Sequence, residues 1–173
     1  MKKFILFLAI GFLLIIAQSI WRMIIPFGSP DFVFILVVYS GIYRNRLVGP
    51  LLAFVLGICI DALFGLQPGI FAVIYTASFF LSRLSGRRFY MRSYPFQLLI
   101  VVAMTALAKL MQYALLRTLD PQPNLAALIW DSTWRQIIWN GVLAIPIVSL
   151  LERIDLWTED DYSDRFMGRI GVF

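Results

Sequence analysis

Two charged side chains that interrupt apolar runs are the residues of this sequence best placed to do chemistry. Asp61 lies within LGICIDALFGLQPG (residues 56–69), and Lys109 lies within the apolar run 94–119. A charge at the centre of a membrane helix costs about 2.5–3.5 kcal/mol on insertion scales. Each of the two side chains must therefore face protein or water and have a partner.

The residue types that most enzymes need are missing from the sequence. There is no histidine, which removes the commonest general base and metal ligand. We find no phosphate-binding glycine loop, no carboxylate pair at catalytic spacing, no zinc-ligand spacing and no nucleophile beside a base. The single cysteine, Cys59, leaves no disulfide within the chain. The sequence predicts a protein that is not an enzyme and has no cofactor or metal.

The composition is that of a membrane protein. Of the 173 residues 61% are hydrophobic and 14% are charged, more apolar surface than a soluble domain of this size can bury. Apolar runs and their Pro, Gly and charged breakers predict an all-α polytopic helix bundle with six transmembrane helices, at 4–25, 31–43, 47–64, 68–84, 94–119 and 135–151. A count of four or five spans remains open if 31–43 and 47–64 form a re-entrant pair.

The basic residues predict the orientation of the bundle. With both termini in the cytoplasm, three basic residues lie outside (Arg22, Arg117 and Arg135) and Lys109 lies within a span. The other eleven lie inside: Lys2, Lys3, Arg44, Arg46, Arg83, Arg87, Arg88, Arg92, Arg153, Arg165 and Arg169. This bias follows the positive-inside rule, so we expect a multi-pass protein of the bacterial inner membrane, and the loop positions argue against a nucleic-acid partner.

Three segments are less regular. The start MKKFILFLAIGFLLIIAQS resembles a secretory signal, but its apolar character continues to Ile25, so we interpret it as the first membrane helix. NLAALIWDSTWRQ (124–136) fits either a short interfacial helix or an aromatic belt at the start of the last span. Residues 152–173 carry six of the ten acidic residues and read as a cytoplasmic tail behind a bundle of residues 1–151.

Small residues recur at every fourth position of the span 47–64 and form a ridge with Asp61: Gly49, Ala53, Gly57, Asp61 and Gly65. Residues four apart lie on one face of a helix, and a ridge of small side chains lets a second helix approach closely. The favoured interpretation is packing against the chain's own helices. The alternative is a docking face for the membrane helix of another protein.

Depth in the membrane suggests a partner for Asp61. Asp61 lies about 21 Å, and Lys109 about 22 Å, along their helices from the inner boundary at a rise of 1.5 Å per residue. Because both helices run outward, an Asp61–Lys109 pair is possible, with Thr105 and Gln112 on the same face as Lys109. The alternative is an Asp61 close enough to the outer interface to be solvated.

Asp31 has a simpler explanation within the SPD sequence at 29–31. Ser29 is a suitable cap for the second span, Pro30 suits a first turn, and Asp31 lies at the positive end of the helix dipole. A structural role is therefore favoured over a partner contact.

Residues 30–80 resemble the MreD family of bacterial rod-shape-determining membrane proteins. The resemblance is carried by the proline-aspartate opening at Asp31, a glycine-rich hairpin, and glycine-x3-aspartate (Gly57 and Asp61) before a glycine-containing turn (Gly65 and Gly69). It implies a non-enzymatic component of the cell-elongation machinery that binds the single-span protein MreC. Further implied partners are MreB filaments, RodA and the elongation penicillin-binding transpeptidase. The family is also similar to the six-helix substrate-binding subunits of energy-coupling-factor transporters.

Two functions follow from these observations. In the first, the polar residues and the small-residue ridge organise a compact scaffold for partner helices. In the second, the same polar residues line a cavity for a small molecule such as a vitamin. The scaffold is favoured, because the outer loops FGLQPG and DPQPN are too short to form a lid.

Overall fold

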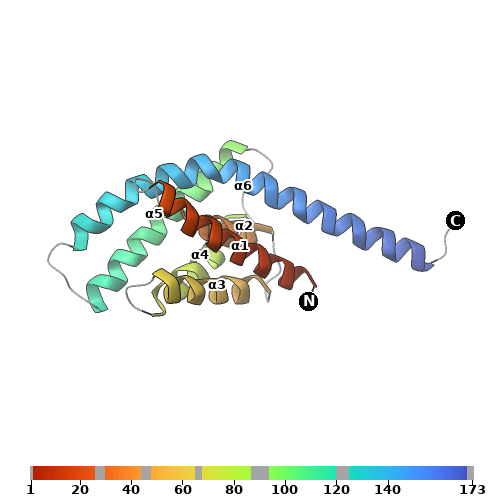
Figure 1. The fold of residues 1–173 in the computed structure, drawn as a ribbon, viewed down its shortest axis with the longest axis horizontal. Coiled ribbons are helices and arrows are strands. Elements are labelled where there is room, and N and C mark those ends of the chain that lie inside the picture. Colours follow the sequence, from red (N-terminus) through yellow and green to blue (C-terminus); the bar gives the residue numbers. More distant parts are fainter. Residues whose placement is uncertain are drawn as a thin grey trace.

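A computed structural model describes residues 2–25, 30–43, 48–64, 68–86, 94–119 and 125–170. Within these ranges the side chains of 2–3, 64, 86, 94–96, 125–128 and 157–170 are not described. The described chain is all-helical, as predicted (Figure 1). Its helices are α1 (Lys2–Ile24), α2 (Phe32–Tyr43), α3 (Val48–Phe64), α4 (Ile70–Gly86), α5 (Tyr94–Leu119) and α6 (Leu125–Ile170).

Three of these helices hold segments long and apolar enough to cross a membrane: Phe4–Ile24 in α1, Gln97–Leu119 in α5 and Ile129–Leu156 in α6. The apolar helices α2, α3 and α4 have 12, 17 and 17 residues. At 1.5 Å per residue α2 is only about 18 Å long, against about 30 Å of hydrocarbon. That each of the three shorter helices crosses the membrane stays a prediction.

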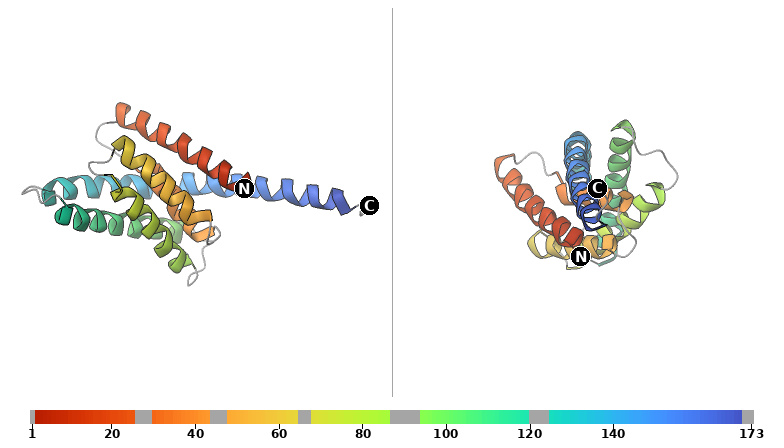
Figure 2. Two further views of the ribbon diagram at one scale, coloured as in Figure 1. Left: turned by 90° about the horizontal axis from the view of Figure 1, so that it is seen from below. Right: turned by 90° about the vertical axis from the view of Figure 1, so that its right-hand side faces the viewer.

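The short helix α2 lies at the centre of the bundle. Every residue from Asp31 to Gly41 is buried, and α2 contacts all five other helices. The two views of Figure 2 show the longer helices arranged around it. A segment enclosed by protein needs no particular length to match the bilayer, because its residues meet side chains and not lipid.

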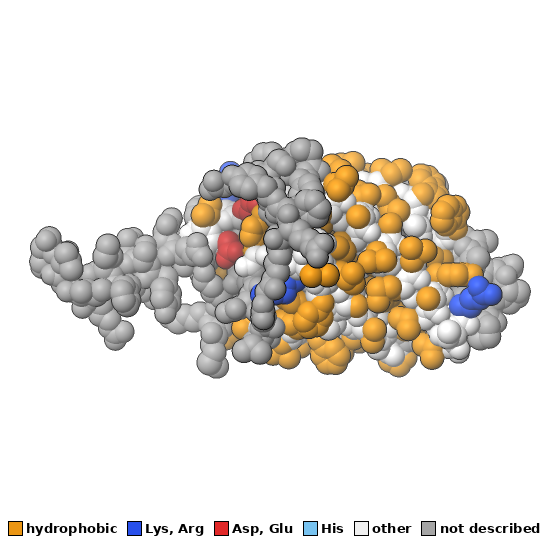
Figure 3. Space-filling view, turned by 180° about the vertical axis from the view of Figure 1, so that it is seen from behind, with side chains coloured by type: hydrophobic (Ala, Val, Ile, Leu, Met, Phe, Trp, Pro, Cys, Tyr) orange, Lys and Arg blue, Asp and Glu red, His pale blue; other side chains and the backbone are white. Residues whose placement is uncertain are grey.

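The outer surface of the bundle is apolar. Large hydrophobic side chains point outward along the long helices, including Ile5, Leu13 and Met23 of α1 and Leu110 of α5. Figure 3 shows hydrophobic side chains over the broad middle of one face, with the described charged side chains toward its two ends. Such a surface suits lipid and not water.

The ridge of small residues on α3 faces α4. A Cβ added at Gly49 would meet the ring of Phe79, and one added at Gly57 would lie 2.5 Å from Ala72 Cα. Ala53 is buried between them. Gly49 and Gly57 are thus covered by α4 and Ala53 is buried, so the three positions offer no free face to another protein. Gly65 lies outside the described residues.

Helix α6 differs most from its predicted extent of 135–151. Its backbone is helical without interruption from Leu125 to Ile170, with Pro146 inside it. Residues 125–136 therefore form the first turns of this long helix and not a separate interfacial helix. Figure 1 shows α6 continuing out of the bundle at the end where the N-terminus also lies. The division into a bundle (1–151) and a tail (152–173) stays a prediction.

The close approach of α3 and α4 gives a first testable prediction. Gly57→Ala would place a methyl group 2.5 Å from Ala72 Cα and 2.8 Å from Ala72 N, both backbone atoms that cannot rotate away. We expect a destabilisation of about 1–3 kcal/mol, although alanine has the higher helix propensity. Thermal unfolding in detergent measures the effect.

Gly141→Ala is the matched control, because its added Cβ would meet only Val102 Cγ2, at 3.3 Å. We expect a smaller loss there. Equal unfolding temperatures for Gly57→Ala and the wild type would contradict the packing argument.

Candidate functional site

The carboxylate of Asp61 binds the first turn of the next helix. Its Oδ1 accepts a hydrogen bond from Phe71 N at 2.9 Å, and its Oδ2 accepts one from Ala72 N at 3.0 Å. The first N–H groups of a helix have no partner within the helix, and the helix dipole favours a negative charge beside them. Gly69, which directly precedes α4, has no side chain with which to cap it and adopts φ +96°. Asp61, only 8% exposed, therefore caps α4 from α3.

This geometry corrects the Asp61–Lys109 pair considered from the sequence. The Asp61 carboxylate is bound to backbone N–H groups of α4, whereas Lys109 Nζ donates to Gln112 Oε1 at 3.1 Å on its own helix. The estimate of depth gave no information on lateral position, and α4 packs against both α3 and α5. Lys109 instead lines a cavity together with Asp31.

The carboxylate of Asp31 accepts hydrogen bonds from two helices, α2 and α4. Its Oδ1 accepts from Phe34 N at 3.0 Å, which caps α2, and Tyr75 Oη donates to Oδ1 and Oδ2 at 2.8 and 2.7 Å. Its own backbone N–H donates to Asn140 Oδ1 at 2.8 Å. Asp31 is 6% exposed, so these bonds replace the water that a carboxylate would otherwise need.

Asn140 extends this network to a fourth helix. It is fully buried, and its Nδ2 donates to Thr105 Oγ1 at 3.2 Å, while Thr105 Oγ1 donates to Val101 O at 2.7 Å. We call Asp31, Tyr75, Thr105 and Asn140 the Asp31 network. It joins the start of α2 to α4, α5 and α6, and every member has a hydrogen-bond partner.

A small cavity adjoins the Asp31 network. Its volume is about 20 Å³, and its polar walls come from Asp31, Tyr75, Thr105, Lys109, Gln112 and Gln136. A space of this size holds one or two waters or a single small group. It is far too small for a vitamin, which weighs against the carrier interpretation.

A second polar network lies near the other end of α2. Glu152 Oε1 accepts from Gln97 Nε2 at 2.9 Å and from Tyr43 Oη at 3.3 Å, and Tyr39 Oη donates to Asp155 Oδ2 at 3.2 Å. We call these five residues the Glu152 network. It ties α6 to α2 and α5, so two acidic residues assigned to the tail by the sequence contact the bundle.

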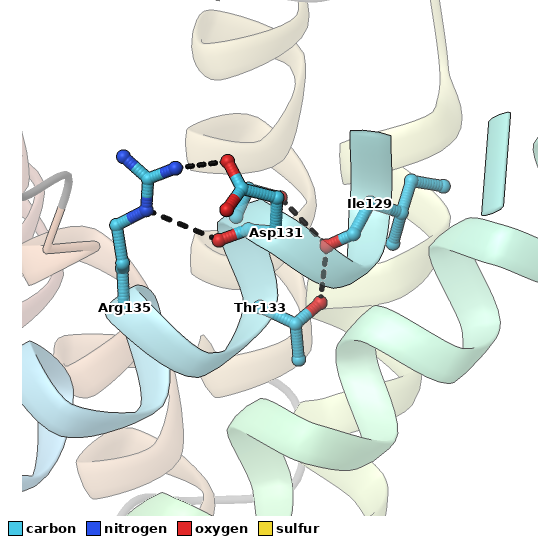
Figure 4. A network of polar contacts seen from close by, with 5 residues as sticks. Ile129, Asp131, Thr133 and Arg135 are labelled. Carbon is cyan, nitrogen blue, oxygen red and sulfur yellow. Dashed lines mark hydrogen bonds and ion pairs between the residues drawn. The ribbon is translucent and has the colours of Figure 1, made fainter. Parts of the chain in front are cut away.

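The start of α6 carries polar contacts that remain within one helix (Figure 4). Arg135 forms an ion pair with Asp131, and its Nε donates to Asp131 O at 3.2 Å. Ser132 and Thr133 donate to Ile129 O at 2.9 and 2.6 Å. Trp130 is 75% exposed beside them. The exposed Arg135–Asp131 pair contributes little to stability, and these local contacts suit a helix end at a membrane surface.

Several residues of these networks and of the cavity wall were not singled out by the sequence. Tyr75, Gln97, Gln136 and Asn140 are single polar residues in apolar helices, and no spacing distinguishes them. The one available signal was their polarity in a segment predicted to lie in lipid. Among the described residues no group of His, Cys, Asp or Glu side chains could hold a metal.

Comparison with protein families identifies the chain. Residues 1–154 match the family model described as rod shape-determining protein MreD. The chain belongs to the MreD family. It is thus a rod-shape-determining membrane protein, as the resemblance of residues 30–80 implied. No curated protein and no solved structure matches the chain.

The cap on α4 gives a second prediction. Asp61→Ala removes the acceptors of two buried N–H groups and should destabilise the protein by about 1–2 kcal/mol, as loss of a helix cap does. The matched control is Asp131→Ala. The Asp131 side chain is 62% exposed, so its removal should lower the free energy of unfolding by about 0.5 kcal/mol or less. Thermal unfolding compares them.

A double variant tests whether Asp61 and Lys109 interact. Because the two side chains bind different groups, the destabilisation of an Asp61→Ala, Lys109→Ala double variant should be the sum of the single losses. A double variant that is destabilised by less than that sum would show that Asp61 and Lys109 interact directly.

The Asp31 network gives a third prediction. Tyr75→Phe removes the hydroxyl that donates to both oxygens of Asp31 and should cost about 1.5–3 kcal/mol, the range for a hydrogen bond to a charged group. Tyr113→Phe is the control, because the Tyr113 hydroxyl accepts only a 3.5 Å contact from exposed Arg117. A loss as small for Tyr75→Phe as for Tyr113→Phe would show that the Asp31 contact contributes nothing.

Proposed function

We propose that this MreD-family protein is a multi-pass scaffold of the cell-elongation machinery in the bacterial inner membrane. It binds MreC and, through MreC, connects cytoplasmic MreB filaments with RodA and the elongation penicillin-binding transpeptidase. The observation that carries the proposal is the family match over residues 1–154.

The hydrogen bonds that the buried polar residues form between helices support a scaffold. In the described chain Asp31 and Asp61 each accept hydrogen bonds from the start of a helix, and Asn140 joins two helices. Side chains engaged in this way hold helices in place and are not free to bind a substrate. The cavity of about 20 Å³ beside them leaves no room for a transported vitamin.

The position of the ridge restricts where a partner helix binds. Gly49 and Gly57 pack against α4 and Ala53 is buried, so a single-span partner must use another surface. Outward apolar side chains on α1, α5 and α6 provide such surfaces in the membrane, for example Leu13, Leu110 and Ile138. In lipid, packing and not the hydrophobic effect would hold a partner there.

Complementation and co-purification test the proposal together. Expressed in a rod-shaped bacterium that lacks its own MreD-family protein, alongside the MreC from the same genome as this chain, the protein should restore rod shape. MreC should remain bound through detergent purification. Gly57→Ala, which disturbs the α3–α4 contact, should reduce both readouts, and Gly141→Ala should leave them nearly unchanged.

A protein that restores no rod shape and retains no MreC would contradict the scaffold. Isolation of the chain with a tightly held small molecule and without MreC would favour the carrier.

A further inference from the structure

Helix α6 has a proline in its interior, well beyond its first turn. Pro146 has no N–H to continue the helical hydrogen bonds, and its ring crowds the carbonyl of Val142 one turn earlier. Both residues are exposed on the outer face of α6, whereas Ala144 and Val148 are buried on its inner face. A proline on the outer face bends a helix towards its inner face. Figure 1 shows α6 arching over the bundle with its convex side outward, as this position of the proline requires.

The proline lies midway between the two points at which α6 is hydrogen-bonded to α2. Asn140 and Glu152 are each six residues from Pro146, about 9 Å along the helix at a rise of 1.5 Å per residue. Asn140 Oδ1 accepts from Asp31 N at 2.8 Å, and Glu152 Oε1 accepts from Tyr43 Oη at 3.3 Å. One bent helix therefore holds both the start and the end of α2.

A straight α6 would not keep both attachments. A change of direction of about 20°, where a sharp kink begins, moves a residue about 9 Å away by about 3 Å. A displacement of that size breaks a hydrogen bond. Asn140 is fully buried, whereas Tyr43 is 43% exposed, so water can replace the partner of Tyr43 more easily than that of Asn140. In a straightened helix we therefore expect the Glu152 network to break and the Asp31 network to remain.

The bend also determines where the last turns of α6 lie. Beyond Glu152 the backbone of α6 stays helical to Ile170, and Figure 1 shows it leaving the bundle at the end where the N-terminus also lies. The distribution of basic residues assigns this end to the cytoplasm. Ile170 lies about 36 Å beyond Pro146, so a change of direction of about 20° moves the end of the helix by about 12 Å.

We propose that Pro146 is a positioning residue, whose bend lets α6 hold both ends of α2 and sets the direction in which α6 enters the cytoplasm. The importance of this direction rests on the proposed function, because a scaffold joined to cytoplasmic filaments must present its cytoplasmic part at a fixed place. The bend itself is independent of that function.

Distances between spin labels on the full chain in lipid nanodiscs test the bend. The labels are attached at Ile5→Cys of α1 and Leu156→Cys of α6, positions that are 62% and 60% exposed, and Cys59→Ser removes the single native cysteine. Pro146→Ala supplies the missing N–H and removes the ring, so α6 should straighten away from the bundle. We expect the distance between the labels to increase by about 5 Å, since Leu156 lies about 15 Å beyond Pro146.

Pro50→Ala is the matched control, because Pro50 lies in the first turn of α3, where a helix makes no use of the N–H. It should leave the distance unchanged. A second pair of labels, at Leu13 of α1 and Leu110 of α5, should report the same distance in both variants and so show that the bundle is intact. Pro146→Leu also supplies the N–H and repeats the test if Pro146→Ala does not fold.

An unchanged distance between the labels at positions 5 and 156 in Pro146→Ala overturns the proposal. An equal increase in Pro50→Ala overturns it as well, because the change would then not come from the bend in α6.

Restoration of rod shape tests the importance of the direction. Pro146→Ala should restore rod shape less well than the wild type, whereas Pro50→Ala should restore it nearly as well. Full restoration by a Pro146→Ala chain with the longer distance would show that the direction of α6 does not matter. A wild-type chain that restores no rod shape would contradict the proposed function and would leave the distance measurement valid.

Discussion

A carboxylate bound to the exposed N–H groups of a neighbouring helix is the contact on which the α3–α4 hairpin depends. Asp61 caps α4 because Gly69 before it has no side chain to do so. The carboxylate reaches α4 because Gly57, one turn earlier, lets the backbone of Ala72 approach closely. Gly57 thus allows the close approach of the two helices, Asp61 caps α4, and Gly69 allows the turn before α4. The three residues act together in this hairpin.

The same constraint explains the centre of the bundle. Helix α2 is too short to cross a bilayer alone, and its polar start would be unstable in lipid. The Asp31 carboxylate caps α2 and also accepts a hydrogen bond from Tyr75 of α4. The backbone N–H of Asp31 donates to Asn140 of α6. The bonds that make a short buried helix possible are therefore also those that fix its neighbours around it.

Apolar runs predicted the bounds of the first five helices to within two residues, because the loops between them carry Pro, Gly and charge. The last helix was predicted too short, since hydropathy marks only its part in lipid and says nothing of helix beyond it. Depth along a helix was accessible from residue counts, but lateral position was not. That is why the sequence offered Lys109 as a possible partner of Asp61, whereas the Asp61 carboxylate accepts from the N–H groups of α4. Backbone N–H groups are present in every helix, so the sequence gives no sign of which ones a side chain meets.

The two polar networks together bear on what kind of protein this bundle can be. A carrier must let its helices move apart to admit and release a ligand. Here α6 is bound to α2 near both ends of that helix, through Asn140 at Asp31 and through Glu152 at Tyr43. Displacing α6 would leave the buried backbone N–H of Asp31 and the buried amide of Asn140 without partners, each at a cost of about 1–3 kcal/mol. Gln97 of α5 and Tyr75 of α4 strengthen the same two points, so separation of any one helix breaks contacts of several. Helices fastened to one another in this way keep a fixed arrangement, which supports the scaffold proposed above over a carrier.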